Sequence, residues 1–216
     1  MRSVLVAGWR TGSSFTSAII NSHPANFYYA EPLQDFGDIR IRGPLLVDAA
    51  IKNIHAFFNC EYNKLQHFID FGASLPWVYD KNQGLSSYCK NQRDLCSDPV
   101  FLTAVCQLYP FQSMKLNALP LEYAQLLLED EYLGVRMILL VRDPRGTMQS
   151  RRRLEWCQNS TDCSDPKVLC NDMVSDYKVA AKLKKKYPHA FKVVRCMKIY
   201  LSILSIKRKK CLNFMV

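Results

Sequence analysis

The chain has 216 residues, 49% of them hydrophobic, and a formal net charge of +10. This length and composition favour one globular domain with a sizeable core. No run of about 18 or more apolar residues occurs, so we expect no membrane-spanning helix, and no internal repeat or low-complexity linker is present.

The first predicted element is a buried strand over residues 3–7, because Val4-Leu5-Val6-Ala7 is a short, branched apolar run. Glycines then permit a tight turn, and Ser13 suits the start of a helix over residues 13–22. Free N–H groups at that helix start, with the fixed charge of Arg10, favour an anion site. The alternative is an ordinary strand–turn–helix with a capping serine.

The middle of the chain continues the alternation of strand and helix. Strands are predicted over residues 27–30 and 113–116, and helices over residues 46–58 and 119–130. We expect residues 60–112, which are rich in aromatic side chains, to be irregular, to cap the sheet and to shape a substrate cleft.

A second strand-to-helix segment carries another potential phosphate site. A nearly continuous apolar run predicts a strand over residues 136–142, and Pro144 suits the first turn of a helix over residues 144–155. Arg142 at the strand end and Ser150 on the helix together suit a monoester phosphate. A solvated basic helix start is the alternative, since other arginines crowd the segment. Two such sites in one chain suggest a ligand with phosphates at both ends.

The last predicted elements are a helix over residues 167–186 and a strand over residues 190–195. The alternation of strands and helices predicts an α/β fold with a parallel sheet. Residues 178–216 hold twelve Lys or Arg and no Asp or Glu, which leaves 17 basic and 19 acidic residues elsewhere. The basic excess is therefore a property of the C-terminal tail. We interpret that tail either as an aberrant end or as a binding segment for lipid, nucleic acid or sulfated glycan.

The segments RTGSSF (residues 10–15) and RDPRGTMQS (residues 142–150) resemble the 5′-phosphosulfate loop and the 3′-phosphate motif of sulfotransferases, which use 3′-phosphoadenosine 5′-phosphosulfate (PAPS). The resemblance is closest to Golgi carbohydrate sulfotransferases that sulfate the 6-hydroxyl of galactose or N-acetylglucosamine. Residues 27–33, with an aromatic-rich EPL segment, and residues 154–176 also resemble that family.

The resemblance runs from about Val4 to Cys196 and implies a P-loop-like sulfotransferase fold whose C-terminal part is missing. Residues 1–196 are then an incomplete sulfotransferase domain, and residues 197–216 are a tail unrelated to the family. The family's N-terminal anchor is also absent, so we expect a chain truncated at both ends. The resemblance implies a Golgi enzyme with PAPS as co-substrate and a glycan such as keratan sulfate as acceptor. It implies no metal, no nucleic acid, and membrane contact only through the absent anchor.

The resemblance also assigns the donor-binding residues. It implies that the 3′-phosphate is bound by Arg142 and Ser150, and that the 5′-phosphosulfate is bound by Arg10, Thr11, Gly12, Ser13, Ser14 and Phe15.

Glu31 is our candidate general base, because it follows the second strand at the carboxyl edge where α/β proteins bind ligands. The aromatic residues before Glu31 are expected to desolvate its carboxylate and to raise its pKa. A surface glutamate before a proline is the alternative. His23 is the rival base. Lys115, at a strand end, is a candidate for stabilising leaving-group charge, with an ordinary solvated lysine as the alternative.

Nine cysteines and four histidines are present without any C-x-x-C spacing, so we expect no zinc site. Cys89 and Cys96, and the set of Cys157, Cys163 and Cys170, are expected to form disulfides in an oxidising lumen. Asn159 begins a glycosylation sequon in the same region.

Two rival functions remain. A P-loop nucleotide kinase would share the fold but requires Gly-Lys-Ser/Thr, which this chain lacks. The second is a non-catalytic remnant of a sulfotransferase that binds anions or glycans, for which the basic tail is the cue.

Overall fold

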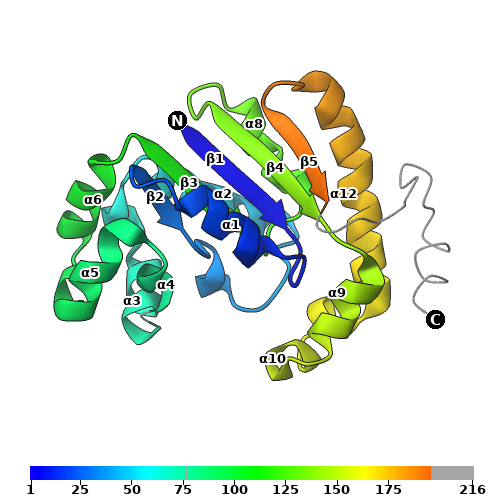
Figure 1. The fold of residues 1–216 in the computed structure, drawn as a ribbon, viewed down its shortest axis with the longest axis horizontal. Coiled ribbons are helices and arrows are strands. Elements are labelled where there is room, and N and C mark those ends of the chain that lie inside the picture. The colour runs from blue at the N-terminus through cyan, green and yellow to red at the C-terminus, as the bar shows by residue number, and fades with distance from the viewer. Residues whose placement is uncertain (76, 196–216) are drawn as a thin grey trace.

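A parallel five-stranded sheet forms the centre of the molecule, with the strand order β2-β3-β1-β4-β5 (Figure 1). The computed structural model describes residues 1–75 and 77–195, and the tail expected over residues 197–216 lies outside them. The strands are β1 (Arg2–Ala7), β2 (Asn26–Tyr29), β3 (Phe111–Leu116), β4 (Val135–Val141) and β5 (Phe191–Arg195). The prediction of an α/β fold with a parallel sheet is confirmed.

Helices connect successive strands. The α-helices of the described residues are α1 (Ser13–Asn21), α2 (Pro44–Phe58), α3 (Gln66–Ser74), α4 (Trp77–Asp80), α5 (Gln83–Asn91), α6 (Pro99–Gln107), α7 (Leu121–Ala124), α8 (Leu126–Glu129), α9 (Pro144–Arg151), α10 (Glu155–Gln158), α11 (Thr161–Ser164) and α12 (Pro166–Lys186). Three short 3₁₀ segments are η1 (Gln34–Phe36), η2 (Tyr62–Lys64) and η3 (Arg93–Ser97).

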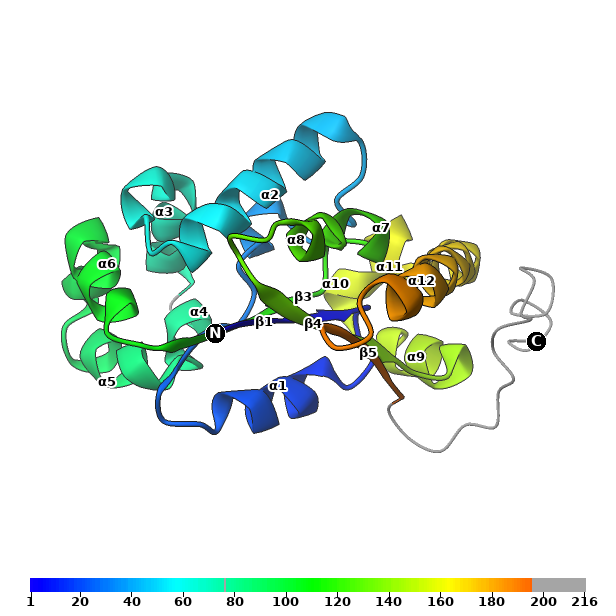
Figure 2. The ribbon, with the colours of Figure 1, turned by 90° about the horizontal axis from the view of Figure 1, so that it is seen from above.

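The two faces of the sheet carry cores of different size. Val4 and Val6 belong to the large core, which also includes Ala180 and Leu183 of α12. Leu5 and Ala7 alternate with them and face a small core that Ile20 of α1 completes. Figure 2 shows α1 and α9 on one side of the sheet, and α2, α7, α8 and α12 on the other.

The expectation that residues 60–112 are irregular is wrong, because this stretch forms α3, α4, α5 and α6. Two of these helices begin with ordinary capping signals. The side chain of Asn82 accepts a hydrogen bond from the N–H of Gly84, and Asp98, which Pro99 follows, accepts one from Val100. Two other helices are shorter than predicted: the helix over residues 119–130 divides into α7 and α8, and α9 ends at Arg151.

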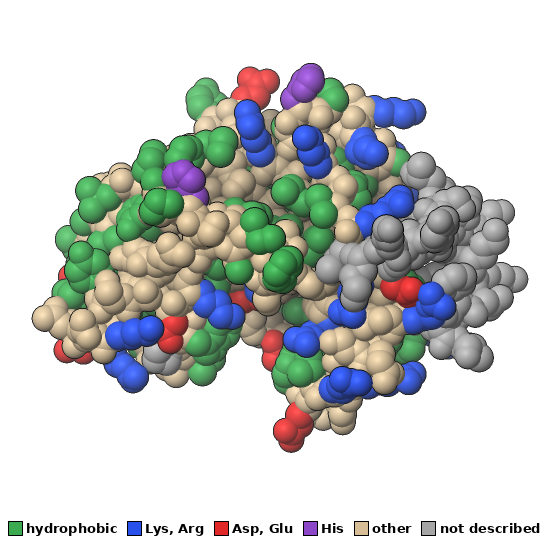
Figure 3. Space-filling view, viewed as in Figure 1, with side chains coloured by type: hydrophobic (Ala, Val, Ile, Leu, Met, Phe, Trp, Pro, Cys, Tyr) green, Lys and Arg blue, Asp and Glu red, His purple; other side chains and the backbone are tan. Residues whose placement is uncertain are grey.

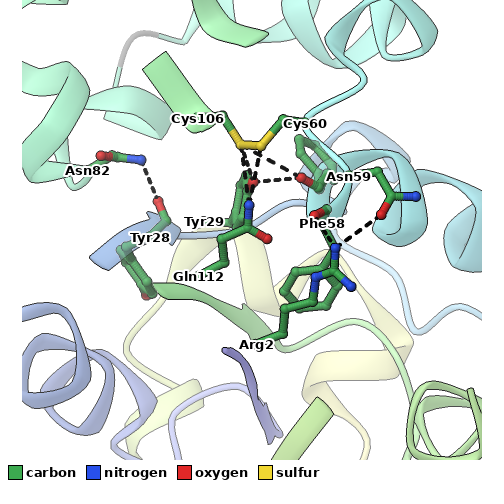
Figure 4. Close-up of a disulfide and its surroundings, with 10 residues drawn as sticks. Arg2, Tyr28, Tyr29, Phe58, Asn59, Cys60, Asn82, Cys106 and Gln112 are labelled. Carbon is green, nitrogen blue, oxygen red and sulfur yellow. Dashed lines mark hydrogen bonds between the residues drawn. A yellow bond between two sulfur atoms is a disulfide. The ribbon is translucent and has the colours of Figure 1, made fainter. Parts of the chain in front are cut away.

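A disulfide between Cys60 and Cys106 links the end of α2 to α6 (Figure 4). The Tyr29 hydroxyl, on β2, donates to the Phe57 carbonyl at 2.6 Å and lies 3.1 Å from the Cys106 sulfur. The Gln112 amide, on β3, donates to the sulfur of Cys60. This disulfide therefore joins the helical segment after β2 to two strands of the sheet.

The expected disulfide between Cys89 and Cys96 is present and links α5 to η3. Of the set Cys157, Cys163 and Cys170, the first two are bonded to each other. No helix within residues 1–75 and 77–195 has both the length and the apolar character needed to cross a membrane.

Candidate functional site

A cleft of about 640 Å³ lies at the carboxyl ends of the strands. Its walls come from the segments that follow β1, β2, β3 and β4, and from α4 and α10. The strand ends meet there because Val6 pairs with Leu116 of β3 and Ala7 pairs with Leu140 of β4. Figure 3 shows the surface hollowed between α4 and α10. The volume lies within the usual range for small-molecule sites.

The loop after β1 presents the start of α1 to this cleft. Gly12 is the N-cap of α1 with φ of 94°, a left-handed conformation that favours glycine, and no side chain caps the helix. The alternative of an ordinary helix start with a capping serine is therefore wrong. Ser13, Ser14 and Phe15 line the cleft, so the first-turn N–H groups and the positive end of the helix dipole lie beside it. Thr11 is buried instead, and its hydroxyl donates to the Gly8 carbonyl at 2.8 Å.

The two segments expected to bind phosphates meet in space. The Arg142 guanidinium donates to the Arg10 carbonyl at 2.9 Å, and Arg10 Nε donates to the Ser150 hydroxyl at 2.9 Å. Arg10 and Arg142 both line the cleft, whereas Ser150 does not line it and contacts it through its hydrogen bond with Arg10. The Arg142 guanidinium packs directly beside α9, because a Cβ on Gly146 would lie in van der Waals contact with two of its nitrogens, at 3.4 Å.

Glu31 also lines the cleft, two residues after the end of β2. Its carboxylate forms an ion pair of 2.5 Å with Lys115 and accepts a hydrogen bond of 2.8 Å from the Asn117 amide. Burial raises the pKa of Glu31, while Lys115 and Asn117 act in the opposite direction. The carboxylate is thus desolvated, held in one orientation and open to the cleft, which are the properties required of a general base.

Lys115 and His23 lie in contrasting places. Lys115 is buried with 3% exposure, so the interpretation as an ordinary solvated lysine is wrong. His23 precedes β2 at the opposite edge of the sheet, where its ring packs against Phe111 and its Nδ1 accepts from the Ala25 N–H. His23 does not line the cleft, so the structure gives no support to it as a base.

Sequence reasoning did not single out Arg151, which is buried behind the loop after β1. Its Nε donates to the Trp9 carbonyl at 3.3 Å and its NH1 donates to the Cys163 carbonyl at 3.0 Å. Burial lowers the pKa of Arg151 to about 10. The Cys157–Cys163 disulfide, Arg151 and the loop after β1 therefore form one connected support for the site. In the sequence, Arg151 is indistinguishable from the exposed arginines beside it.

The expectation that residues 60–112 help to shape a cleft is confirmed at Trp77, but sequence reasoning singled out no individual residue in the outer part of the cleft. Its lining includes Trp77 of α4, Trp156 of α10, Gln34 and Asp38. These residues come from segments with no shared spacing, so only the fold reveals that they are neighbours. Within the described ranges, no group of three or more His, Cys, Asp or Glu side chains is placed to hold a metal ion.

Comparison with known proteins links the chain to one family. It is 28% identical to carbohydrate sulfotransferase 5 of Mus musculus over 181 residues, which cover 69% of this chain and 43% of that protein. It is 29% identical to carbohydrate sulfotransferase 3 of Homo sapiens over 182 residues, covering 68% and 36% respectively. Carbohydrate sulfotransferase 6 of Homo sapiens is 25% identical over 170 residues, covering 69% and 43%.

The matched region thus spans less than half of these relatives. No protein-family model and no solved structure matches the chain. The matches to several carbohydrate sulfotransferases agree with the parallel α/β sheet and its flanking helices. The chain is thus similar to several carbohydrate sulfotransferases over about two thirds of its length.

Proposed function

We propose that this chain transfers a sulfuryl group from PAPS to a sugar hydroxyl, with the 6-hydroxyl of N-acetylglucosamine or galactose as the acceptor. The observation that carries the proposal is the meeting of two cationic strand-to-helix segments and one buried carboxylate at a single cleft. The names of the relatives support sulfuryl transfer to a carbohydrate.

The donor suits the charge and shape of one wall of the cleft. The 5′-phosphosulfate lies at the start of α1, where Gly12 leaves the backbone accessible and Ser13 and Ser14 supply N–H groups. The 3′-phosphate lies near Arg142 and Ser150, with Arg10 between the two sites. A guanidinium supplies several charged donors to a phosphate in a fixed geometry.

Glu31 then accepts the proton of the sugar hydroxyl as its oxygen attacks the sulfur atom. The bond between sulfur and the bridging oxygen breaks, and adenosine 3′,5′-bisphosphate leaves. Negative charge that develops on the leaving oxygens is stabilised by Lys115 and by the start of α1. The ion pair with Lys115 opposes the effect of burial on the Glu31 pKa and favours the ionised carboxylate, which is the form that accepts a proton.

The proposal places the enzyme in the Golgi, where glycan acceptors are made. Three disulfides among the described residues agree with an oxidising lumen.

The test is a transfer assay with sulfur-labelled PAPS and an oligosaccharide that ends in N-acetylglucosamine. We expect label on the sugar and release of adenosine 3′,5′-bisphosphate. Binding of the bisphosphate without any transfer would favour the rival function, a non-catalytic remnant that binds anions or glycans. Absence of both binding and transfer would overturn the proposal.

A further inference from the structure

Two tryptophans line the outer part of the cleft, and they come from different helices. Trp77 begins α4, and Trp156 lies on α10. The two helices lie apart in both ribbon views (Figures 1 and 2), the side chain of Trp77 is partly buried, and Trp156 is 36% exposed. Partly exposed indole rings that line a cleft supply flat apolar surfaces to a ligand.

Trp156 is held in a fixed orientation. Its ring meets the ring of Trp9 edge to face, with 5.8 Å between the centroids. The Arg151 guanidinium lies 5.8 Å from the centroid of Trp9, which is itself buried. The disulfide of Cys157, the next residue, closes the segment that carries α10. A ring restrained in this way loses little conformational freedom when a ligand packs on it.

The charged side chains differ between the part of the cleft at the start of α1 and its outer part. The cations that line it, within the described residues, are Arg10, Arg142 and Lys115, all near the start of α1 or paired with Glu31. The outer part carries the Asp38 carboxylate, whose oxygen accepts a hydrogen bond of 2.8 Å from the Gln34 amide.

Two contacts fix other parts of this outer region. The Ser160 hydroxyl donates to the Asp38 carbonyl, which ties η1 to the segment after α10. Lys81 does not line the cleft, and its ammonium group lies 5.3 Å from the ring centroid of Trp77. A negatively charged sugar placed between the tryptophans would therefore meet the Asp38 carboxylate, and the nearby cation, Lys81, lies beyond the lining with its charge already acting on Glu31.

We propose that Trp156 and Trp77 form a subsite for an uncharged pyranose ring of the acceptor, with Asp38 and Gln34 as its polar contacts. This inference rests on the proposed function and extends it, because it names the wall that selects the acceptor. The apolar face of the sugar packs on Trp156, and the ring hydroxyls donate to Asp38. The reacting hydroxyl then points toward Glu31.

Trp156→Ala and Trp77→Ala test the subsite, with Tyr132→Ala as the control because Tyr132 is 98% exposed and does not line the cleft. We expect Trp156→Ala to raise the KM for an oligosaccharide ending in N-acetylglucosamine by about 10-fold, as the loss of an aromatic contact surface predicts. Trp156→Phe should recover most of this loss. The Kd of adenosine 3′,5′-bisphosphate should stay unchanged in every variant.

A second readout does not require catalysis. Titration with the same oligosaccharide should quench tryptophan fluorescence of the wild type, and Trp156→Ala should lose most of that signal. Unchanged KM and quenching in both alanine variants, with normal transfer, would overturn the subsite and leave the proposed function standing. Equal or tighter binding of an oligosaccharide ending in glucuronate would overturn the choice of an uncharged sugar. Quenching without bisphosphate binding or transfer would support the subsite and contradict the proposed function.

Discussion

Replacement of Arg142 by alanine should weaken binding of adenosine 3′,5′-bisphosphate. One nitrogen of the guanidinium is already engaged with the Arg10 carbonyl at 2.9 Å, and two others lie next to Gly146 and remain near the cleft. Arg142 therefore has one or two donors left for a phosphate. A hydrogen bond to a charged group contributes roughly 1.5–3 kcal/mol.

This range corresponds to an increase in Kd of about 10- to 150-fold. Because Arg142 is only half-buried, solvent screening places the expected value toward the lower end. Isothermal titration calorimetry with the bisphosphate measures it directly. Arg142→Lys keeps the charge but loses the forked donor set, so its Kd should lie between those of the wild type and Arg142→Ala.

Arg136→Ala is the matched control, because Arg136 is an exposed arginine on β4, the strand that Arg142 follows, and does not line the cleft. Its Kd should equal that of the wild type. An unchanged Kd in a folded Arg142→Ala protein, verified by circular dichroism, would refute the assignment of Arg142 to the 3′-phosphate.

Four further predictions follow from the same geometry. Gly12→Val should abolish bisphosphate binding, because a branched side chain is strained at φ of 94° and blocks the start of α1, and normal binding in calorimetry would contradict this. Glu31→Gln should lower kcat by about 100- to 10,000-fold with little change in bisphosphate Kd, whereas activity within a few-fold of wild type would reassign the base. Burial raises the pKa of Asp176 to about 6, so its contribution to stability is present below about pH 4 and is lost as the pH rises through 6. In thermal denaturation the wild type should therefore lose stability relative to Asp176→Asn between about pH 4 and pH 6, and parallel curves would exclude this linkage. Replacing Cys60 and Cys106 by serine should lower the free energy of unfolding by up to about 4 kcal/mol, the chain-entropy value for their separation of 46 residues, and an unchanged denaturation midpoint would argue against the bond.

The strands and their order along the chain could be predicted because local signals agreed with the fold. The apolar runs at residues 4–7 and 137–141 became neighbouring central strands, and Pro144 begins α9 as expected. The helices α3 to α6 were not predicted because they are short, and packing against aromatic residues stabilises them more than a helical periodicity of the sequence indicates. The caps at Asn82 and Asp98 were the available signals.

The cationic residues of the site could be predicted from the sequence, whereas the residues that hold them in place could not. Arg10 and Arg142 stand at strand ends, so the topology of a parallel sheet brings them together. The pairing of Glu31 with Lys115 required the register of β2 with β3, which no local pattern specifies. The roles of Trp156 and Arg151 depend on how the chain returns after α9, and that path is set by the Cys157–Cys163 disulfide and by tertiary contacts.

A crystal structure of the chain with adenosine 3′,5′-bisphosphate tests the central claim most directly. We expect one bound molecule in the cleft, with its 5′-phosphate on the N–H groups at the start of α1 and its 3′-phosphate within hydrogen-bond distance of Arg142. Binding in the opposite orientation, or at a place away from Gly12 and Arg142, would contradict the account.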